Sequence, residues 1–146
     1  MEKGMLAIML AAAAVGPVAP GQAAARQAST VTGRWLTETH HGVVEITPCG
    51  TSICGRLIDG EIIRHDPQTR DANNKDATQR QRPLKGLMML HGFHPAGSRW
   101  DGGSVYNPED GGTYHGTLTI IDSQTLKVRG CIVWPLCKSQ AWKRIG

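Results

Sequence analysis

Short segments of alternating apolar and polar residues, separated by turn residues, make up most of the sequence after residue 30. A period of two is typical of a strand with one buried and one solvated face. The segments are Val31–Thr39, Val43–Cys49, Ile53–Arg64, Leu84–His94, Arg99–Tyr106, Thr113–Ile121, Thr125–Cys131 and Cys137–Ile145. They predict an all-β fold, a single small antiparallel eight-stranded up-and-down barrel, because closure buries one face of every strand and removes the sheet edges.

One connection between these segments differs from the others. Residues 65–83 are long and polar and show no period, and within them only Asp76–Arg80 could form a helical turn. Long connections in a compact domain are usually functional or mobile. Of the 18 glycines, 15 lie after residue 25, and together with the prolines and the turn dipeptides throughout the chain they point away from a helical bundle.

The first 25 residues have the organisation of a secretory signal peptide. Lys3 precedes an apolar stretch, residues 5–15, and small residues follow. A glycine and two prolines interrupt the stretch before it reaches the ~18 residues of a membrane span, although an N-terminal membrane helix is the alternative. We expect cleavage between Ala25 and Arg26, which leaves residues 26–146 as one exported domain, periplasmic or secreted, without a membrane span.

The four cysteines form two closely spaced pairs. In an oxidising compartment four cysteines predict two disulfides. Each pair brackets a short turn, and residues on either side of such a turn face each other, so we expect the bonds Cys49–Cys54 and Cys131–Cys137 on the outer face of the sheet. The alternative is a zinc site of four thiolates, whose usual spacing is tighter.

Charge and motifs exclude several classes of function. The net charge of +4 is too small to indicate a nucleic-acid partner. The sequence has no nucleophile elbow, zinc-protease helix, phosphate-binding glycine loop or EF-hand loop, so we expect no catalytic residue, metal or cofactor. Asp71, Asn73 and Asp76 are of calcium-ligand type but lack the central glycine and distal glutamate, and an ordinary turn network is the other interpretation.

Most of the aromatic residues fall on positions predicted to face inward. These are Trp35, Trp100, Tyr106, Tyr114 and Trp142. They either fill a small barrel or line a pocket, in which the two tyrosines, Thr37 and Gln140 would be the polar groups. Small barrels of this kind hold one apolar or amphipathic molecule at the open mouth.

Several motifs in this order resemble one known family. They are Gly33-Arg34-Trp35, Cys49-Gly50, Cys54-Gly55, Asp71-Ala72-Asn73-Asn74, Arg82-Pro83-Leu84-Lys85-Gly86-Leu87, the residues 100–108, Gly111-Gly112-Thr113-Tyr114, the residues 126–131 and the residues 140–144. Over residues 31–145 the chain resembles the domain of unknown function 2147 family, small exported bacterial proteins with no assigned activity. The family usually has Asn-Pro after the acidic residue of the loop, where Lys75 follows Asn74 here.

Gly33-x-Trp35 on a first strand, with Arg144 after a last strand, also resembles the lipocalin or calycin arrangement. The resemblance implies that the tryptophan plugs the closed end of the barrel and that the arginine stacks on it. A guanidinium over an indole face contributes about 0.5–2 kcal/mol.

These observations favour a non-catalytic exported barrel that binds a small hydrophobic or amphipathic ligand in the cell envelope. One alternative is a module that binds an envelope protein through residues 65–83 or a barrel rim. Another is an envelope hydrolase without a recognisable motif. A solid interior would argue against ligand storage, and three or more titratable side chains converging in a cleft would favour the hydrolase.

Overall fold

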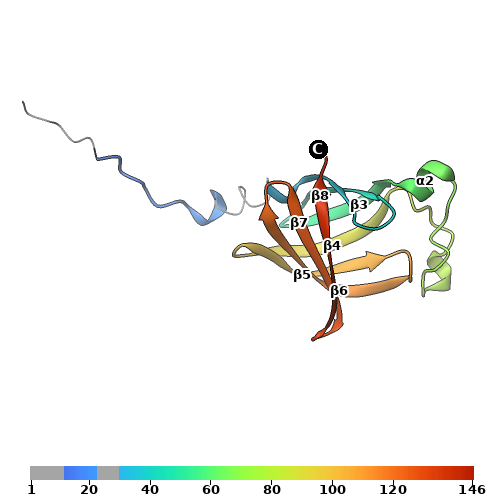
Figure 1. Ribbon diagram of the computed structural model, residues 1–146. Coiled ribbons are helices and arrows are strands. Elements are labelled where there is room, and N and C mark those ends of the chain that lie inside the picture. The colour runs from blue at the N-terminus through green and yellow to red at the C-terminus, as the bar shows by residue number, and fades with distance from the viewer. Residues whose placement is uncertain (1–11, 23–29) are drawn as a thin grey trace, which may run out of the picture.

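The alternation in the sequence becomes eight antiparallel strands in the structure, a computed structural model that describes residues 12–22 and 30–146 (Figure 1). The strands are β1 (Gly33–Leu36), β2 (Val43–Cys49), β3 (Ser52–Asp59), β4 (Leu87–Ala96), β5 (Arg99–Asn107), β6 (Gly112–Asp122), β7 (Thr125–Val133) and β8 (Leu136–Arg144). Each strand pairs with the next and β1 pairs with β8, so the sheet closes. The predicted up-and-down barrel is confirmed.

The part of the chain assigned to a signal peptide is described only in part. The expected cleavage position between Ala25 and Arg26 lies outside the described residues. Within the described ranges, no helix is both long enough and apolar enough to cross a membrane.

The main error in the predicted strands concerns the segment Ile53–Arg64. Its strand ends at Asp59, and Glu61–His65 form the short helix α2. The helix turns the Ile63 side chain into the core and leaves the preceding isoleucine exposed. A short apolar run gives the same periodicity in a strand and in one helical turn, so the pattern alone could not separate them. The helical turn expected within residues 76–80 is present as a 3₁₀ helix, Ala77–Gln79.

Large side chains fill the end of the barrel where β1 begins and β8 ends. Trp35 is completely buried there, and its Nε1 donates a hydrogen bond to the carbonyl of Val31 at 2.9 Å. The Arg144 guanidinium lies 4.2 Å from the centroid of the Trp35 ring and donates to the carbonyls of Ser123 and Thr32, both at 2.9 Å. A Cβ on Gly33 would lie 2.7 Å from Arg144 Nη1, so glycine leaves room for this contact. Trp35 and Arg144 therefore close this end, in the arrangement that the lipocalin resemblance implied.

Phe93, which the sequence analysis did not single out, occupies the middle of the barrel. The side chain is fully buried. A Cβ on Gly103 would lie 2.4 Å from the Phe93 ring, and a Cβ on Gly116 would lie 2.5 Å from it. These two glycines of β5 and β6 therefore make the space that the ring fills. Because Trp35 and Phe93 pack among buried aliphatic side chains, the closed half of the barrel is solid.

Both disulfides are present with the predicted pairing. Cys49 and Cys54 join the two strands of the β2–β3 hairpin with an S–S distance of 2.04 Å, and Cys131 and Cys137 join those of the β7–β8 hairpin. All four sulfur atoms are consumed in this way, which excludes the four-thiolate zinc site.

Removal of one disulfide should lower stability modestly. The double replacement Cys49→Ser and Cys54→Ser opens a loop of only a few residues, so we expect the free energy of unfolding to fall by about 2 kcal/mol. Urea unfolding of the purified variant, compared with the same replacements at Cys131 and Cys137, measures the loss. A midpoint equal to that of the unmodified chain would contradict a stabilising role for this bond.

Candidate functional site

The end of the barrel opposite Trp35 is surrounded by four connections. They are residues 37–42, residues 60–86 with α2, residues 108–111, and the two-residue turn between β7 and β8. Two clefts lie at this mouth, and both have Asn107 and Gln140 in their walls.

The larger cleft has a volume of about 410 Å³ and lies along the ends of β5, β6, β7 and β8. Its lining consists of Val105, Asn107, Asp110, Tyr114, Val128, Gly130, Ile132, Leu136, Cys137, Lys138 and Gln140. Strand pairing places Val105 opposite Tyr114, and Val128 opposite Gln140, on the inner face. The volume falls within the range of small-molecule sites, roughly 300–1,000 Å³. The cleft is thus the outer part of the barrel interior, above the solid half.

Polar groups in the larger cleft stand at its rim. The Tyr114 hydroxyl donates to Asp110 Oδ2 at 2.6 Å, and this hydrogen bond raises the pKa of Tyr114. Burial works to raise the pKa of Asp110, but the hydrogen bonds from Tyr114 and the Gly112 amide outweigh it, and the pKa is lowered. Asp110 is therefore ionised at neutral pH and hydrogen-bonded to Tyr114 and to the Gly112 amide. Lys138, by contrast, has no carboxylate within ion-pair distance among the residues that the structure describes.

The smaller cleft has a volume of about 90 Å³ and lies beneath residues 37–42 and α2. Leu57, Ile63 and Met89 form part of its apolar wall. The Thr37 hydroxyl donates to the carbonyl of Thr39 at 2.7 Å and accepts from the amide of Gly42 at 2.9 Å, which holds the loop together. A cavity of this size is small for an organic ligand.

Two histidine–glutamate pairs stand at the rim of the smaller cleft. His40 Nε2 lies 3.3 Å from Glu109 Oε1, and His41 Nδ1 lies 2.5 Å from Glu61 Oε1. The hydrogen bond from His41 is the largest cause of a lowered pKa at Glu61. All four side chains are largely exposed, as expected of a turn, and the pairs connect the loop 37–42 to α2 and to the β5–β6 connection.

The structure divides the predicted pocket residues into two groups. Thr37, Tyr114 and Gln140 line the clefts at the mouth. The three tryptophans, Trp35, Trp100 and Trp142, are at most 2% exposed and line neither cleft. Gln140 links the groups, because its Oε1 accepts a hydrogen bond from Trp142 Nε1 at 2.8 Å.

Tyr106 does not face inward, which corrects its predicted placement. Trp100 pairs with the buried Leu118, whereas Tyr106 pairs with the exposed Thr113 on the outer face. The register of β5 shifts between residues 101 and 103, where Gly102 has a φ of 76°. A one-residue irregularity exchanges the two faces of the strand beyond it, so positions 100 and 106 do not share a face although their spacing is even.

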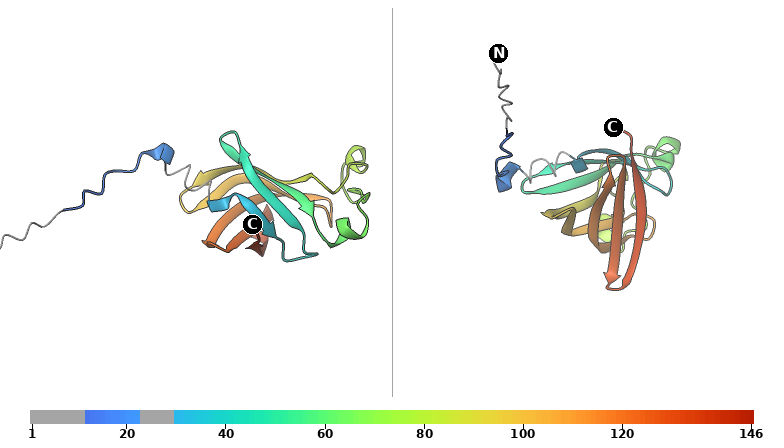
Figure 2. Two further views of the ribbon diagram at one scale, coloured as in Figure 1. Left: turned by 90° about the horizontal axis from the view of Figure 1, so that it is seen from above. Right: turned by 60° about the vertical axis from the view of Figure 1, so that its left-hand side comes forward.

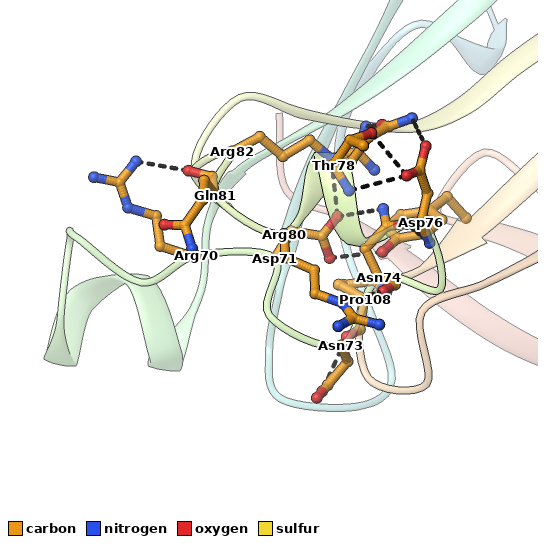
Figure 3. A network of polar contacts seen from close by, with 12 residues as sticks. Arg70, Asp71, Asn73, Asn74, Asp76, Thr78, Arg80, Gln81, Arg82 and Pro108 are labelled. Atoms are coloured by element: carbon orange, nitrogen blue, oxygen red, sulfur yellow. Dashed lines mark hydrogen bonds and ion pairs between the residues drawn. The ribbon is translucent and has the colours of Figure 1, made fainter.

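The residues 65–83 cover the outer face at Tyr106, and Asp71 holds them there. Figure 3 shows Asp71 among the polar contacts within this segment. Asp71 is 1% exposed, and its carboxylate accepts hydrogen bonds from Asn74 Nδ2 at 2.8 Å, Arg82 Nε at 2.8 Å and the Tyr106 hydroxyl at 2.6 Å. The Arg82 guanidinium also lies 5.0 Å from the centroid of the Tyr106 ring. The segment is thus an ordered cover joined to the barrel by one buried carboxylate.

The oxygen atoms considered as calcium ligands are used within this cover. Asp71 faces Arg82 and Tyr106, Asp76 caps the 3₁₀ helix by accepting from the amide of Thr78, and the Asn73 amide donates to the carbonyl of Glu109. In the described ranges no three His, Cys, Asp or Glu side chains are grouped so that they could hold a metal ion. The geometry corresponds to the turn network that the sequence allowed as the other interpretation.

The buried position of Tyr106 should be visible in its ionisation. Burial is the first cause, and the bond to Asp71 the second, that raises its pKa from 10.0 to about 12. The pKa of Tyr106 is higher in the folded than in the unfolded chain. Its contribution to stability is therefore complete below pH 10.0 and is lost as the pH rises toward 12. Unfolding measured across this window should show a steeper loss in the unmodified chain than in Tyr106→Phe.

The chain has two tyrosines, so Tyr114→Phe isolates the signal of Tyr106. An ultraviolet titration of phenolate in that variant should show ionisation well above 10.0. Ionisation at the ordinary value would mean that Tyr106 is solvated and that residues 65–83 do not cover it.

Comparisons with known proteins agree with this geometry. The model of a family described as "Uncharacterized protein conserved in bacteria (DUF2147)" matches residues 33–144. Among solved structures, one described as "Protein HP1028 from the human pathogen Helicobacter pylori belongs to the lipocalin family" is similar with a TM-score of 0.70 and 21% identity, over 80% of this chain and 83% of that chain. At this identity the likeness shows the fold alone. Among curated proteins, none matches the sequence.

Proposed function

This chain belongs to the DUF2147 family, and from the geometry of its barrel mouth we propose that it binds one small amphipathic molecule without chemically changing it. The observation that carries the proposal is the larger cleft of about 410 Å³, whose walls are largely apolar and whose rim holds the ammonium group of Lys138, which has no carboxylate partner in the described part of the chain. The lipocalin-like barrel is compatible with a ligand at this position.

The two parts of the cleft suggest how such a ligand lies. Its apolar part would contact Val105, Val128 and Leu136. Removal of apolar surface from water stabilises the complex by roughly 25 cal/mol per Å². Phe93 and the solid half of the barrel beneath limit the depth, so a short chain or a single ring system fits better than a long lipid tail.

The head group of the proposed ligand is anionic. Lys138 supplies a positive charge at the rim, and charge-assisted hydrogen bonds to a carboxylate are about twice as strong as neutral ones. Asp110 is the acidic side chain in the cleft lining, and it accepts hydrogen bonds from Tyr114 and Gly112 but forms no ion pair with Lys138. A monocarboxylate with an apolar tail therefore matches both parts.

A non-catalytic role is part of the proposal. The smaller cleft carries several titratable groups, but Glu61 and Glu109 are paired with histidines and Asp59 with Arg64 at 2.9 Å. The larger cleft contains Cys137, whose sulfur is in a disulfide. The two disulfides also support export to an oxidising compartment, the cell envelope or the medium, because such bonds are rare in the cytosol.

Dodecanoate, titrated into the purified protein by calorimetry, tests the proposal. We expect saturable binding of one molecule, weaker binding of dodecyltrimethylammonium, and a loss of about tenfold in dodecanoate affinity for Lys138→Met, which corresponds to about 1.4 kcal/mol. The matched control is Lys127→Met, which removes a charge from the outer face of the same hairpin and should leave the affinity unchanged.

Three outcomes would contradict the proposal. One is the absence of dodecanoate binding to the unmodified chain. Another is an equal effect of both lysine replacements, which would indicate general attraction by the positive charge of the protein. Recovery of a chemically altered ligand after incubation, detected by mass spectrometry, would favour the hydrolase instead.

A further inference from the structure

The β7–β8 hairpin reaches beyond the other strands at the mouth of the barrel, as the right-hand view of Figure 2 shows. Its tip, residues 132–136, presents an unusual cluster of exposed apolar side chains. Ile132 is 67% exposed, Trp134 73% and Leu136 63%, and Val133 between them is also exposed. Single exposed apolar residues are common on protein surfaces, but a contiguous cluster marks a surface that contacts something other than water.

The tip is held in one shape before it meets a partner. The Cys131–Cys137 disulfide closes its base, with a Cα–Cα distance of 4.0 Å. The Arg129 guanidinium lies 5.5 Å from the centroid of the Trp134 ring. Because little conformational freedom remains to be lost, contact with a partner costs less entropy than ordering a loose loop would.

The charged side chains of the β7–β8 hairpin that lie nearest the tip are basic. Residues 123–146 contain no aspartate or glutamate, and Arg129 and Lys138 lie within two residues of the disulfide at the base of the tip, whereas Lys127 and Lys143 lie toward the other end of the hairpin. Among the residues that the structure describes, no carboxylate forms an ion pair with Arg129 or Lys138; the acidic side chains of the neighbouring elements hydrogen-bond elsewhere, Asp110 to Tyr114, Glu109 to Thr39 and Glu38 to the amide of residue 141. An apolar tip with basic flanks is therefore complementary to a surface that is negatively charged outside and apolar beneath.

We propose that the tip inserts into the interfacial region of an anionic phospholipid bilayer and docks the barrel mouth against it. Tryptophan is enriched at the level of the lipid head groups, because its ring is amphipathic. Basic side chains beside an anionic membrane each strengthen binding by about fivefold. A second copy of this chain fits less well, because two positively charged hairpins repel each other.

The position of the tip adds a consequence that rests on the proposed function. Ile132 and Leu136 belong to the tip and also line the larger cleft. Insertion of the tip would place the cleft opening next to the bilayer. An amphipathic ligand could then exchange between membrane and cleft without its apolar part crossing bulk water.

Sedimentation of the purified protein with vesicles tests the docking. We expect binding to vesicles of phosphatidylcholine with about a third phosphatidylglycerol, weak binding to phosphatidylcholine alone, and weakening by salt, since exposed charges are screened. Trp134→Ser should reduce the bound fraction by about tenfold or more, and Arg129→Glu by about fivefold or more. Ile121→Ser is the matched control, because Ile121 is also more than half exposed but lies in β6, outside the tip, and it should bind like the unmodified chain.

Fluorescence distinguishes insertion from loose attraction. The three other tryptophans are buried in the barrel, so a blue shift of emission with anionic vesicles reports on Trp134 and should be absent in Trp134→Ser. Dodecanoate binding by Trp134→Ser in solution should equal that of the unmodified chain, which separates this proposal from the ligand site.

Other results would overturn the docking. Equal sedimentation of Trp134→Ser and the unmodified chain would exclude the tip as the anchor. A dimer that Trp134→Ser converts to a monomer, without vesicle binding, would assign the tip to a second copy. Failure to bind anionic vesicles together with Trp134-dependent capture of a protein would assign it to a protein partner.

Discussion

Replacement of Trp35 by alanine should lower the free energy of unfolding by about 3–5 kcal/mol, a large share of what a domain of this size has. The loss has two parts. The change removes a completely buried ring and leaves a cavity at the closed end, and it leaves the carbonyl of Val31 without the Nε1 donor. Thermal or urea unfolding followed by circular dichroism measures the effect.

Arg144→Ala is the informative comparison for Trp35→Ala. It keeps the ring but removes the guanidinium 4.2 Å from its centroid, together with hydrogen bonds to the carbonyls of Thr32 and Ser123. We expect a smaller loss of unfolding free energy, because the Arg144 side chain is only partly buried and the two carbonyls can accept hydrogen bonds from water instead. If Trp35→Ala unfolds at the same denaturant concentration as the unmodified chain, Trp35 does not close the barrel.

Replacement of Phe93 by alanine should be about as damaging, with a loss of about 3–5 kcal/mol, since it empties the middle of the barrel. Gly116→Ala adds volume to the same place instead of removing it, because its Cβ would lie 2.5 Å from the Phe93 ring. Overpacking of this kind costs about 1–3 kcal/mol.

The two changes together should cost less than the sum of the separate losses. In Phe93→Ala the ring beside Gly116 is gone, so the added methyl group fills part of the cavity instead of striking the ring, and its remaining close neighbour is Val105 Cγ2 at 2.8 Å. A double-mutant cycle measured by urea unfolding should therefore show a coupling of about 1 kcal/mol or more. Strict additivity would mean that the Phe93 ring does not rest on Gly116.

Much of the fold could be predicted because it depends on local features. Alternation placed β2 correctly at both ends and identified the remaining strands, though not all of their boundaries. Each disulfide joins residues across one short turn, so its pairing followed from neighbouring positions along the chain. The spacing of Gly33 and Trp35, with Arg144 near the end of the chain, carried the resemblance that implied how the barrel closes.

The candidate site was predictable only in part. Thr37, Tyr114 and Gln140 do lie at the mouth, because period-two alternation extended to the ends of their strands. Lys138 was missed, although it alternates with Gln140 on the inner face of β8. The sequence could have indicated Lys138, because a charged residue at an inward position near a strand end marks the place where a barrel opens to water.

Tyr106 and Phe93 show what only the tertiary structure decided. One extra residue near Gly102 turned Tyr106 to the outer face, where Asp71 and Arg82 cover it. Phe93 fills the barrel because Gly103 and Gly116 leave space for it on two other strands. Periodicity along one strand determines which residues alternate, and that much the amino-acid sequence determined by itself. Where a strand shifts its register, and which side chain fills the space left by another, depend on packing between residues distant in the chain, so these were decided only when the barrel closed.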